Sequence, residues 1–131
     1  MSTVLADEVL IAILHFFRAD MKCDKFTADR EILHNAFFEL RQQDPDALAG
    51  IGFRERYLFH ESAALDQALS NLEATGLLER KNEAPRWYFL SDELDEAFNH
   101  NVRPSLEKSR IKPERFKPLA KSFAKMERVG K

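Results

Sequence analysis

The sequence contains a single cysteine, Cys23, so no disulfide can form within the chain. Such scarcity fits a protein of a reducing compartment. Glycine is also scarce, with 4 residues in 131, which argues against a fold built mainly of loops and strands. Long apolar segments are missing too: residues 9–17 are too few to cross a bilayer, which takes about 20 apolar residues. Because Asp7 and Glu8 replace the positive charge of a secretory signal, we expect a cytoplasmic protein that binds no membrane.

The motifs of catalysis and cofactor binding are missing as well. The four histidines show no metal-ligand spacing with one another or with Cys23, and a zinc site needs at least three converging ligands. There is no glycine-rich phosphate loop. The serines and carboxylates have no spacing that points to nucleophilic catalysis. The sequence therefore predicts no metal, no cofactor and no enzymatic activity.

Charge is distributed very unevenly along the chain. Residues 1–102 contain 10 Lys/Arg and 19 Asp/Glu, a net charge of −9, whereas residues 103–131 contain 10 Lys/Arg and 3 Asp/Glu, a net charge of +7. An acidic body followed by a basic segment is typical of a protein that meets a charged partner or that uses the segment to cover its own surface.

Apolar residues recur at helical spacing in residues 4–21 and again from Thr27 or Asp29 to Gln43. In the first of these helices the apolar residues form two adjacent stripes, so both sides must be covered. One side meets the core, and the other meets either the C-terminal segment or a second subunit. Asp44-Pro45-Asp46 ends the second helix, because proline disfavours helical geometry in the residue before it.

The most informative stretch begins at Ser62, a candidate helix N-cap. Leucine and alanine then repeat at helical spacing until Gly76, which suits a left-handed helix end. Residues 77–81 and 86–90 are predicted strands joined by the turn 82–85. Ser91 starts a further helix with apolar residues four apart: Leu94, Phe98 and Val102.

The stretch from Leu65 to Arg80, followed by Arg86-Trp-Tyr-Phe-Leu-Ser, resembles the third helix and β-wing of the winged helix-turn-helix superfamily. The resemblance lies in the spaced leucines, a glycine before two aliphatic residues, a polar hairpin and a strand that ends in Leu-Ser. It implies a mainly α fold with a two-stranded β-wing and extra C-terminal helices. Residues 1–102 would be the winged-helix domain and residues 103–131 a basic helical arm. A transcription-regulator-like protein that binds double-stranded DNA would follow from this resemblance.

Two features depart from the superfamily pattern. About eighteen residues separate the second and third helices, where a DNA-reading motif usually has three or four. The third helix is also acidic: Glu61, Asp66 and Glu73 lie in or beside it, and no Lys or Arg occurs from Phe59 to Thr75. Because duplex binding depends on neutralising phosphates, both features argue against reading bases through this helix.

The candidate nucleic-acid contacts form three groups. Gln67, Ser70 and Asn71 lie on the outward face of the third helix, where Gln and Asn could pair with adenine, although a solvated polar face explains them as well. The predicted wing offers cations for phosphates, with an ordinary charged hairpin as the alternative. The C-terminal helix adds a basic side. The cations of the wing and of the C-terminal helix are Arg80, Lys81, Arg86, Lys117, Lys121 and Lys125.

Candidate partner contacts are aromatic. If Tyr88 faces the core, strand alternation turns Trp87 and Phe89 outward, as a contact patch or as a surface that another part of the chain covers. In the C-terminal segment, Phe116 and Phe123 are further interface candidates. The segment itself has three possible roles: docking on its own domain or on a second subunit, contacting nucleic acid, or binding an undefined partner.

We therefore expect a cytoplasmic winged-helix regulator, a homodimer, that contacts nucleic-acid phosphates with its wing and basic tail. The dimer would use the second face of the first helix and the C-terminal helices. The alternative is a winged-helix module that binds a protein partner, and no nucleic acid, through Trp87, Phe89 or the acidic third helix.

Overall fold

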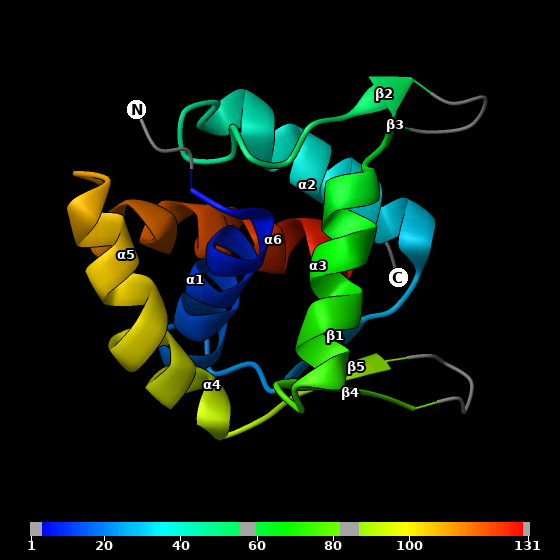
Figure 1. Ribbon diagram of the computed structural model, residues 1–131. Helices are drawn as coiled ribbons and strands as arrows, with labels where there is room; N and C mark the ends of the chain where they lie inside the picture. The colour runs from blue at the N-terminus through cyan, green and yellow to red at the C-terminus, as the bar shows by residue number, and fades with distance from the viewer. Residues whose placement is uncertain (1–3, 56–59, 82–86, 130–131) are drawn as a thin grey trace.

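The computed structural model describes residues 4–55, 60–81 and 87–129 and is mainly helical, with two small antiparallel sheets (Figure 1). The predicted mainly α class is confirmed. The elements follow in this order: α1 (Ala6–Ala19), β1 (Lys25–Thr27), α2 (Arg30–Gln43), β2 (Arg54–Glu55), β3 (His60–Glu61), α3 (Ala63–Ala74), β4 (Leu78–Lys81), β5 (Trp87–Leu90), α4 (Glu93–Ala97), the π-helical turn η1 (Phe98–Val102), α5 (Arg103–Lys108), the 3-10 turn η2 (Pro113–Phe116) and α6 (Lys117–Val129).

Helix α1 lies at the centre of the molecule, with α3 and α6 packed against it and the α4–η1 helix beside it (Figure 1). Both of its apolar stripes are buried along the helix: Val9 and Ile13 of one stripe and Leu10 and Leu14 of the other are fully inaccessible to solvent, whereas Leu5, just before the helix, is exposed. Its second stripe is thus covered within the chain, by the C-terminal segment. The premise of the expected dimer seam, an open apolar face on this helix, is wrong.

The helix ends follow the local signals in the sequence. Asp29 caps α2, because its side chain accepts a hydrogen bond from the backbone N–H of Ile32 at 3.0 Å. Ser62 caps α3 in the same way, with its Oγ accepting from the N–H of Leu65 at 3.1 Å. Gly76 has a φ of 81°, the left-handed conformation that glycine adopts without strain.

The sheet beside α3 has three strands in the order β1-β5-β4: the two predicted strands are present as β4 and β5, and the prediction lacked β1. Residues Lys25–Thr27 were not predicted as a strand. They pair with β5 in antiparallel register, which places Phe26 opposite Tyr88 on the core side. Phe26 is fully buried and stacks on Tyr88 with ring centres 5.2 Å apart. A three-residue strand leaves no alternation to detect in a sequence.

The long connection between α2 and α3 contributes to the core. Ala47, Leu48 and Ile51 are fully buried in it, and β2 and β3 form a short hairpin before α3 begins. At Gly50, an added Cβ would lie 2.3 Å from the carbonyl oxygen of Val4, so only glycine lets these two backbone segments approach.

Residues 93–108 form one helical run, which crosses the boundary expected after residue 102. Its π-helical turn ends at Val102, two residues before Pro104. The ring of this proline would clash with a carbonyl four residues earlier in a regular helix, and its nitrogen has no hydrogen to donate. Further on, Phe116, Leu119 and Phe123 join the same hydrophobic cluster as α1 and α2. The C-terminal segment is thus part of the common core.

Candidate functional site

The exposed side of α3 brings Gln67 and Asn71 together. Asn71 is half-buried, and its side-chain NH2 donates to the Oδ2 of Asp7 in α1 at 3.0 Å. Its carbonyl oxygen accepts from the NH2 of Gln67 at 2.9 Å. A bidentate contact with adenine uses both of these amide atoms, and both are already bonded within the protein. Ser70 is exposed but lies on the side of α3 that faces β4 and β5.

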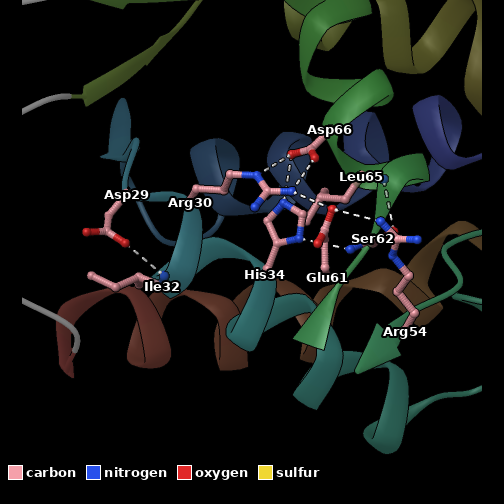
Figure 2. Close-up of polar contacts among 9 residues, drawn as sticks. All are labelled: Asp29, Arg30, Ile32, His34, Arg54, Glu61, Ser62, Leu65 and Asp66. Atoms are coloured by element: carbon pink, nitrogen blue, oxygen red, sulfur yellow. Dashed lines mark hydrogen bonds and ion pairs between the residues drawn. The ribbon is translucent and has the colours of Figure 1, made fainter. Parts of the chain in front are cut away.

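A polar cluster joins the start of α2 to the start of α3 (Figure 2). Arg30 donates from Nε and from one terminal nitrogen to the two carboxylate oxygens of Asp66, at 3.2 and 2.7 Å. The same terminal nitrogen lies 3.2 Å from the Oε1 of Glu61. On the other side of Glu61, Arg54 approaches that oxygen to 3.7 Å. The acidic side chains at the start of α3 are therefore neutralised by arginines of the same chain.

His34 lies beneath this cluster and is fully buried. The backbone N–H of Ser62 donates to its Nδ1 at 3.0 Å, so Nε2 carries the hydrogen and donates to the Oδ1 of Asp66 at 2.8 Å. Burial lowers the pKa of His34 despite the attraction of Asp66. The ring is a neutral link between α2 and the N-terminus of α3. Because both ring nitrogens are hydrogen-bonded within the protein, neither can donate to or accept from a substrate.

The pKa values of the paired groups follow from their contacts. Partial burial raises the pKa of Asp66, but hydrogen bonds from Arg30 and His34 outweigh it, so the net pKa is lowered. The hydrogen bond to Asp66 raises the pKa of Arg30 in turn. Asp66 is thus a stable carboxylate, and its charge is used to orient α2 against α3.

A cleft of ≈ 320 Å³ lies between α3 and the sheet. Arg80 of β4 reaches within 3.9 Å of Glu73, and Arg30 is held by Asp66. Burial and the nearby Glu73 raise the pKa of Tyr88 to about 12, so this side chain stays neutral. Positive and negative groups are balanced in the cleft, which makes it a poor receptor for an anion. Its remaining lining residues are Ala28, Leu69 and Ser70.

The sheet presents a face of a different character, which we call the outer sheet face: Lys25, Lys81, Trp87 and Phe89. Tyr88 is buried on the core side, and Trp87 and Phe89 are half-buried on the opposite side, as strand alternation predicts. The Nζ of Lys25 lies 4.8 Å from the ring centre of Trp87 and 6.0 Å from that of Phe89. The Nζ of Lys81 lies 4.6 Å from the ring centre of Phe89. This face combines aromatic rings with lysine side chains.

The predicted wing cations are placed differently from one another. Lys81 and Arg80 are both exposed, but Arg80 lies beside Glu73 whereas Lys81 has no carboxylate partner among the described residues. Arg86 and the predicted turn 82–85 lie outside the described residues. Lys25 was not among the predicted contacts, because its strand was not predicted.

Helix α6 carries Lys117, Lys121 and Lys125, which we call the lysine ridge. All three side chains are exposed and recur every four residues, which places them along one side of the helix. None of them is paired with a carboxylate in the part of the chain that the structure describes. Lys117 also lies 5.5 Å from the ring centre of Phe16. Among the described residues, the ridge is the largest group of predicted cations without a carboxylate partner.

The opposite side of α6 corrects the expected partner interface. Phe116 and Phe123 are fully buried, and Phe123 contacts Phe17, Phe26 and Phe37 with ring centres 5.2 to 5.6 Å apart. Their side chains fill the core of their own chain, so they cannot also form a surface for a partner. Only Trp87 and Phe89 of the four predicted interface residues remain accessible.

The cluster around Asp66 was not predicted either, since the hydrogen-bonded pairs that join α2 to the start of α3 are 28 to 36 residues apart in sequence. One signal was present: His34 stands between apolar positions of the buried face of α2, where a polar residue needs a partner.

Among the described residues, no three His, Cys, Asp or Glu side chains converge as metal ligands. No helix in this part of the chain is long and apolar enough to cross a bilayer.

Comparison with family models, with curated proteins and with solved structures gave no match for this chain.

Proposed function

We propose that this protein is a winged-helix protein that binds nucleic acid through phosphate contacts. The order α1-β1-α2-α3-β4-β5, with the sheet order β1-β5-β4, supports the winged-helix assignment. The observation that carries the functional part is the contrast in pairing. The arginines beside α3 face carboxylates, whereas the lysines of the ridge and of the outer sheet face have no carboxylate partner within residues 4–55, 60–81 and 87–129. Cations that no carboxylate of the protein neutralises are the groups that can replace the counterions of a polyanion.

The lysine ridge suits an extended anionic chain. Residues four apart in a helix are separated by about 6 Å along its axis, so three lysines offer a row of evenly spaced charges. Lys25 and Lys81 add two cations on the outer sheet face. In this proposal the phosphates provide most of the binding energy, and the affinity falls as salt concentration rises.

The role of α3 in this proposal is structural. Its exposed polar face contains no cation, and its carboxylates Asp66 and Glu73 would repel phosphates near the cleft. Gln67 remains exposed but is bonded to Asn71. We therefore propose binding with little dependence on base sequence, in contrast to the major-groove reading expected of a winged helix.

The test is a salt series with fluorescently labelled DNA, measured by anisotropy on the full-length protein. The variant Lys121→Gln/Lys125→Gln removes two cations of the ridge. The matched control, Lys108→Gln/Lys112→Gln, removes two exposed lysines from the α5–η2 region. Each lost phosphate contact should reduce the slope of log K against log salt by about 0.7 to 0.9, so the ridge variant should lose roughly 1.4 to 1.8.

The control should retain the slope of the unmodified protein. If both double variants lower the affinity equally, the ridge has no special role and binding depends on net charge alone. If the unmodified protein binds no nucleic acid at low salt, the proposed function is wrong. Truncation is unsuitable as a test, because the C-terminal segment supplies Phe116, Leu119 and Phe123 to the core.

A second candidate is a protein-interaction module that uses the outer sheet face. The observation in its favour is the pair of accessible aromatic rings, since Trp is enriched in the energetic centres of protein interfaces. A homodimer is the simplest such assembly. Sedimentation of the full chain tests it, and replacement of Trp87 with serine should then reduce the mass from dimer to monomer while the helical circular dichroism remains.

A further inference from the structure

We infer that the outer sheet face is a stacking platform for the bases of single-stranded nucleic acid. The inference rests on the proposed function and names its substrate class. The ring of Trp87 and the ring of Phe89 stand two residues apart on β5, and therefore on the same face of the sheet. Aromatic side chains of this kind hold unpaired bases in proteins that bind single strands.

The register of the sheet places cations on both sides of these rings. Lys25 of β1 pairs directly across from Phe89, and Lys81 of β4 pairs across from Trp87, so the aromatic strand lies between two lysine-bearing strands. Both ammonium groups lie within 6.0 Å of a ring centre. A strand of nucleic acid needs this combination, with rings for the bases and cations for the phosphates that flank them.

The lysines that now lie over the rings do not prevent stacking. An exposed cation–π contact is weaker than the stacking of a base on an aromatic ring, and lysine has a long flexible side chain. When a base takes the ring face, the ammonium group can move to the adjacent phosphate. Lys25 and Lys81 thereby exchange a weak contact for a charge-assisted one.

A duplex fits this surface poorly. Its bases are stacked on one another and paired, so their flat faces are not offered to Trp87 or Phe89. The neighbouring helix α3 is the element that would enter a major groove, and it carries Asp66 and Glu73 beside the sheet. Glu79 is also exposed on β4, directly across from Phe89, and its negative charge weakens a phosphate contact beside that ring for either form of nucleic acid.

Trp87 is the only tryptophan in the chain, so its fluorescence reports directly on the proposed platform. The experiment titrates the full-length protein with a 12-nucleotide single strand of mixed sequence and with the duplex of the same sequence. We expect quenching of Trp87 emission by the single strand and at least about 10-fold tighter binding than for the duplex.

Two variants separate stacking from charge. Phe89→Leu keeps an apolar side chain but removes the ring, and should weaken single-strand binding by about 10-fold while the salt slope stays the same. Phe38→Leu is the matched control. Phe38 is also half-buried, but it belongs to α2, and its ring stacks on that of His60 with ring centres 3.7 Å apart, away from this sheet. It should leave the affinity unchanged. Lys25→Gln/Lys81→Gln should reduce the salt slope by about 1.4.

The outcomes distinguish this inference from the function on which it rests. Equal affinity for both forms of DNA with unchanged Trp87 emission would overturn the platform and leave phosphate binding intact. If the protein binds neither form of DNA at low salt, both the stacking platform and the proposed phosphate binding are wrong. If poly-glutamate quenches Trp87 as strongly as the single strand does and competes with it equally, the face recognises an acidic chain in general, and the assignment to nucleic-acid bases is wrong.

Discussion

The surface at α3 and the lysine ridge of α6 use their charges in opposite ways. Around α3, Arg30 is bound to Asp66, Arg54 approaches Glu61 and Arg80 approaches Glu73. On α6, three lysines point to solvent without a carboxylate partner among the described residues. Arginine, with its planar fork of donors, makes the contacts between elements, and lysine remains at the surface. The charges of the expected recognition helix therefore hold it in place, whereas the lysine ridge has charges that remain available to a partner.

Arginine–carboxylate pairs join distant elements elsewhere too. Arg18 of α1 donates to Asp95 and Asp92 at 2.7 and 2.6 Å, and Arg115 of η2 donates to both oxygens of Asp44 at 2.7 Å. The hydrogen bond from Arg115 lowers the pKa of Asp44. The acidic body thus uses a substantial part of its negative charge to position its own helices.

The largest effect is expected on the inner side of α6. Phe123→Ala removes a fully buried ring that touches three other phenylalanines, and should lower the free energy of unfolding by about 3–5 kcal/mol. Lys121→Ala, on the outer side of the same helix, should change it by less than about 0.5 kcal/mol. Urea denaturation of both variants measures the difference. Similar values for the two would mean that α6 is not anchored in the core.

The next effect concerns the link between α2 and α3. His34→Ala leaves the buried N–H of Ser62 without its acceptor and creates a cavity, and should lower the free energy of unfolding by about 2–4 kcal/mol. Asn35→Ala, one residue away and exposed, is the control and should cost less than about 0.5 kcal/mol. An unchanged midpoint of thermal unfolding for His34→Ala would show that the cluster does not hold α3 in place.

A pH dependence follows from the same histidine. Its pKa is lower in the folded chain than the ordinary value of 6.5, so as the pH falls the unfolded chain binds the proton first. The stability contributed by neutral His34 is complete above pH 6.5 and is lost as the pH falls through the lower folded pKa. Urea midpoints measured between pH 7.5 and 5 should therefore decrease for the unmodified protein, and less so for His34→Gln. If the urea midpoints of the two proteins decrease in parallel with pH, a neutral His34 with a lowered pKa is contradicted.

The smallest effect is expected at the exposed face of α3. Gln67→Ala should change the affinity for DNA by less than about twofold. It should change the free energy of unfolding by less than about 0.5 kcal/mol. Anisotropy with several DNA sequences measures the first quantity. A loss of affinity for one sequence alone would mean that α3 reads bases, and the contrast between α3 and the lysine ridge would then have to be abandoned.

Much of the helical fold could be predicted because its signals are local. The N-caps at Asp29 and Ser62 and the left-handed glycine at position 76 depend on neighbouring residues only. The strand at Lys25–Thr27 could not be predicted, since three residues acquire strand geometry only by pairing with β5. The assignment of Phe116 and Phe123 to an interface was wrong for a related reason: an amphipathic helix has the same pattern whether it covers its own domain or a partner.

The positions of α1, α2 and α3, the outward alternation of Trp87 and Phe89, and the row of lysines at 117, 121 and 125 followed from the amino-acid sequence alone. Only the tertiary structure decided which charges are paired, because Arg30, His34 and Asp66 meet across more than thirty residues of chain. It also decided that α6 closes the second face of α1. The reason is physical: backbone geometry and periodicity are set over a few residues, whereas burial and charge neutralisation depend on which segments the fold brings together.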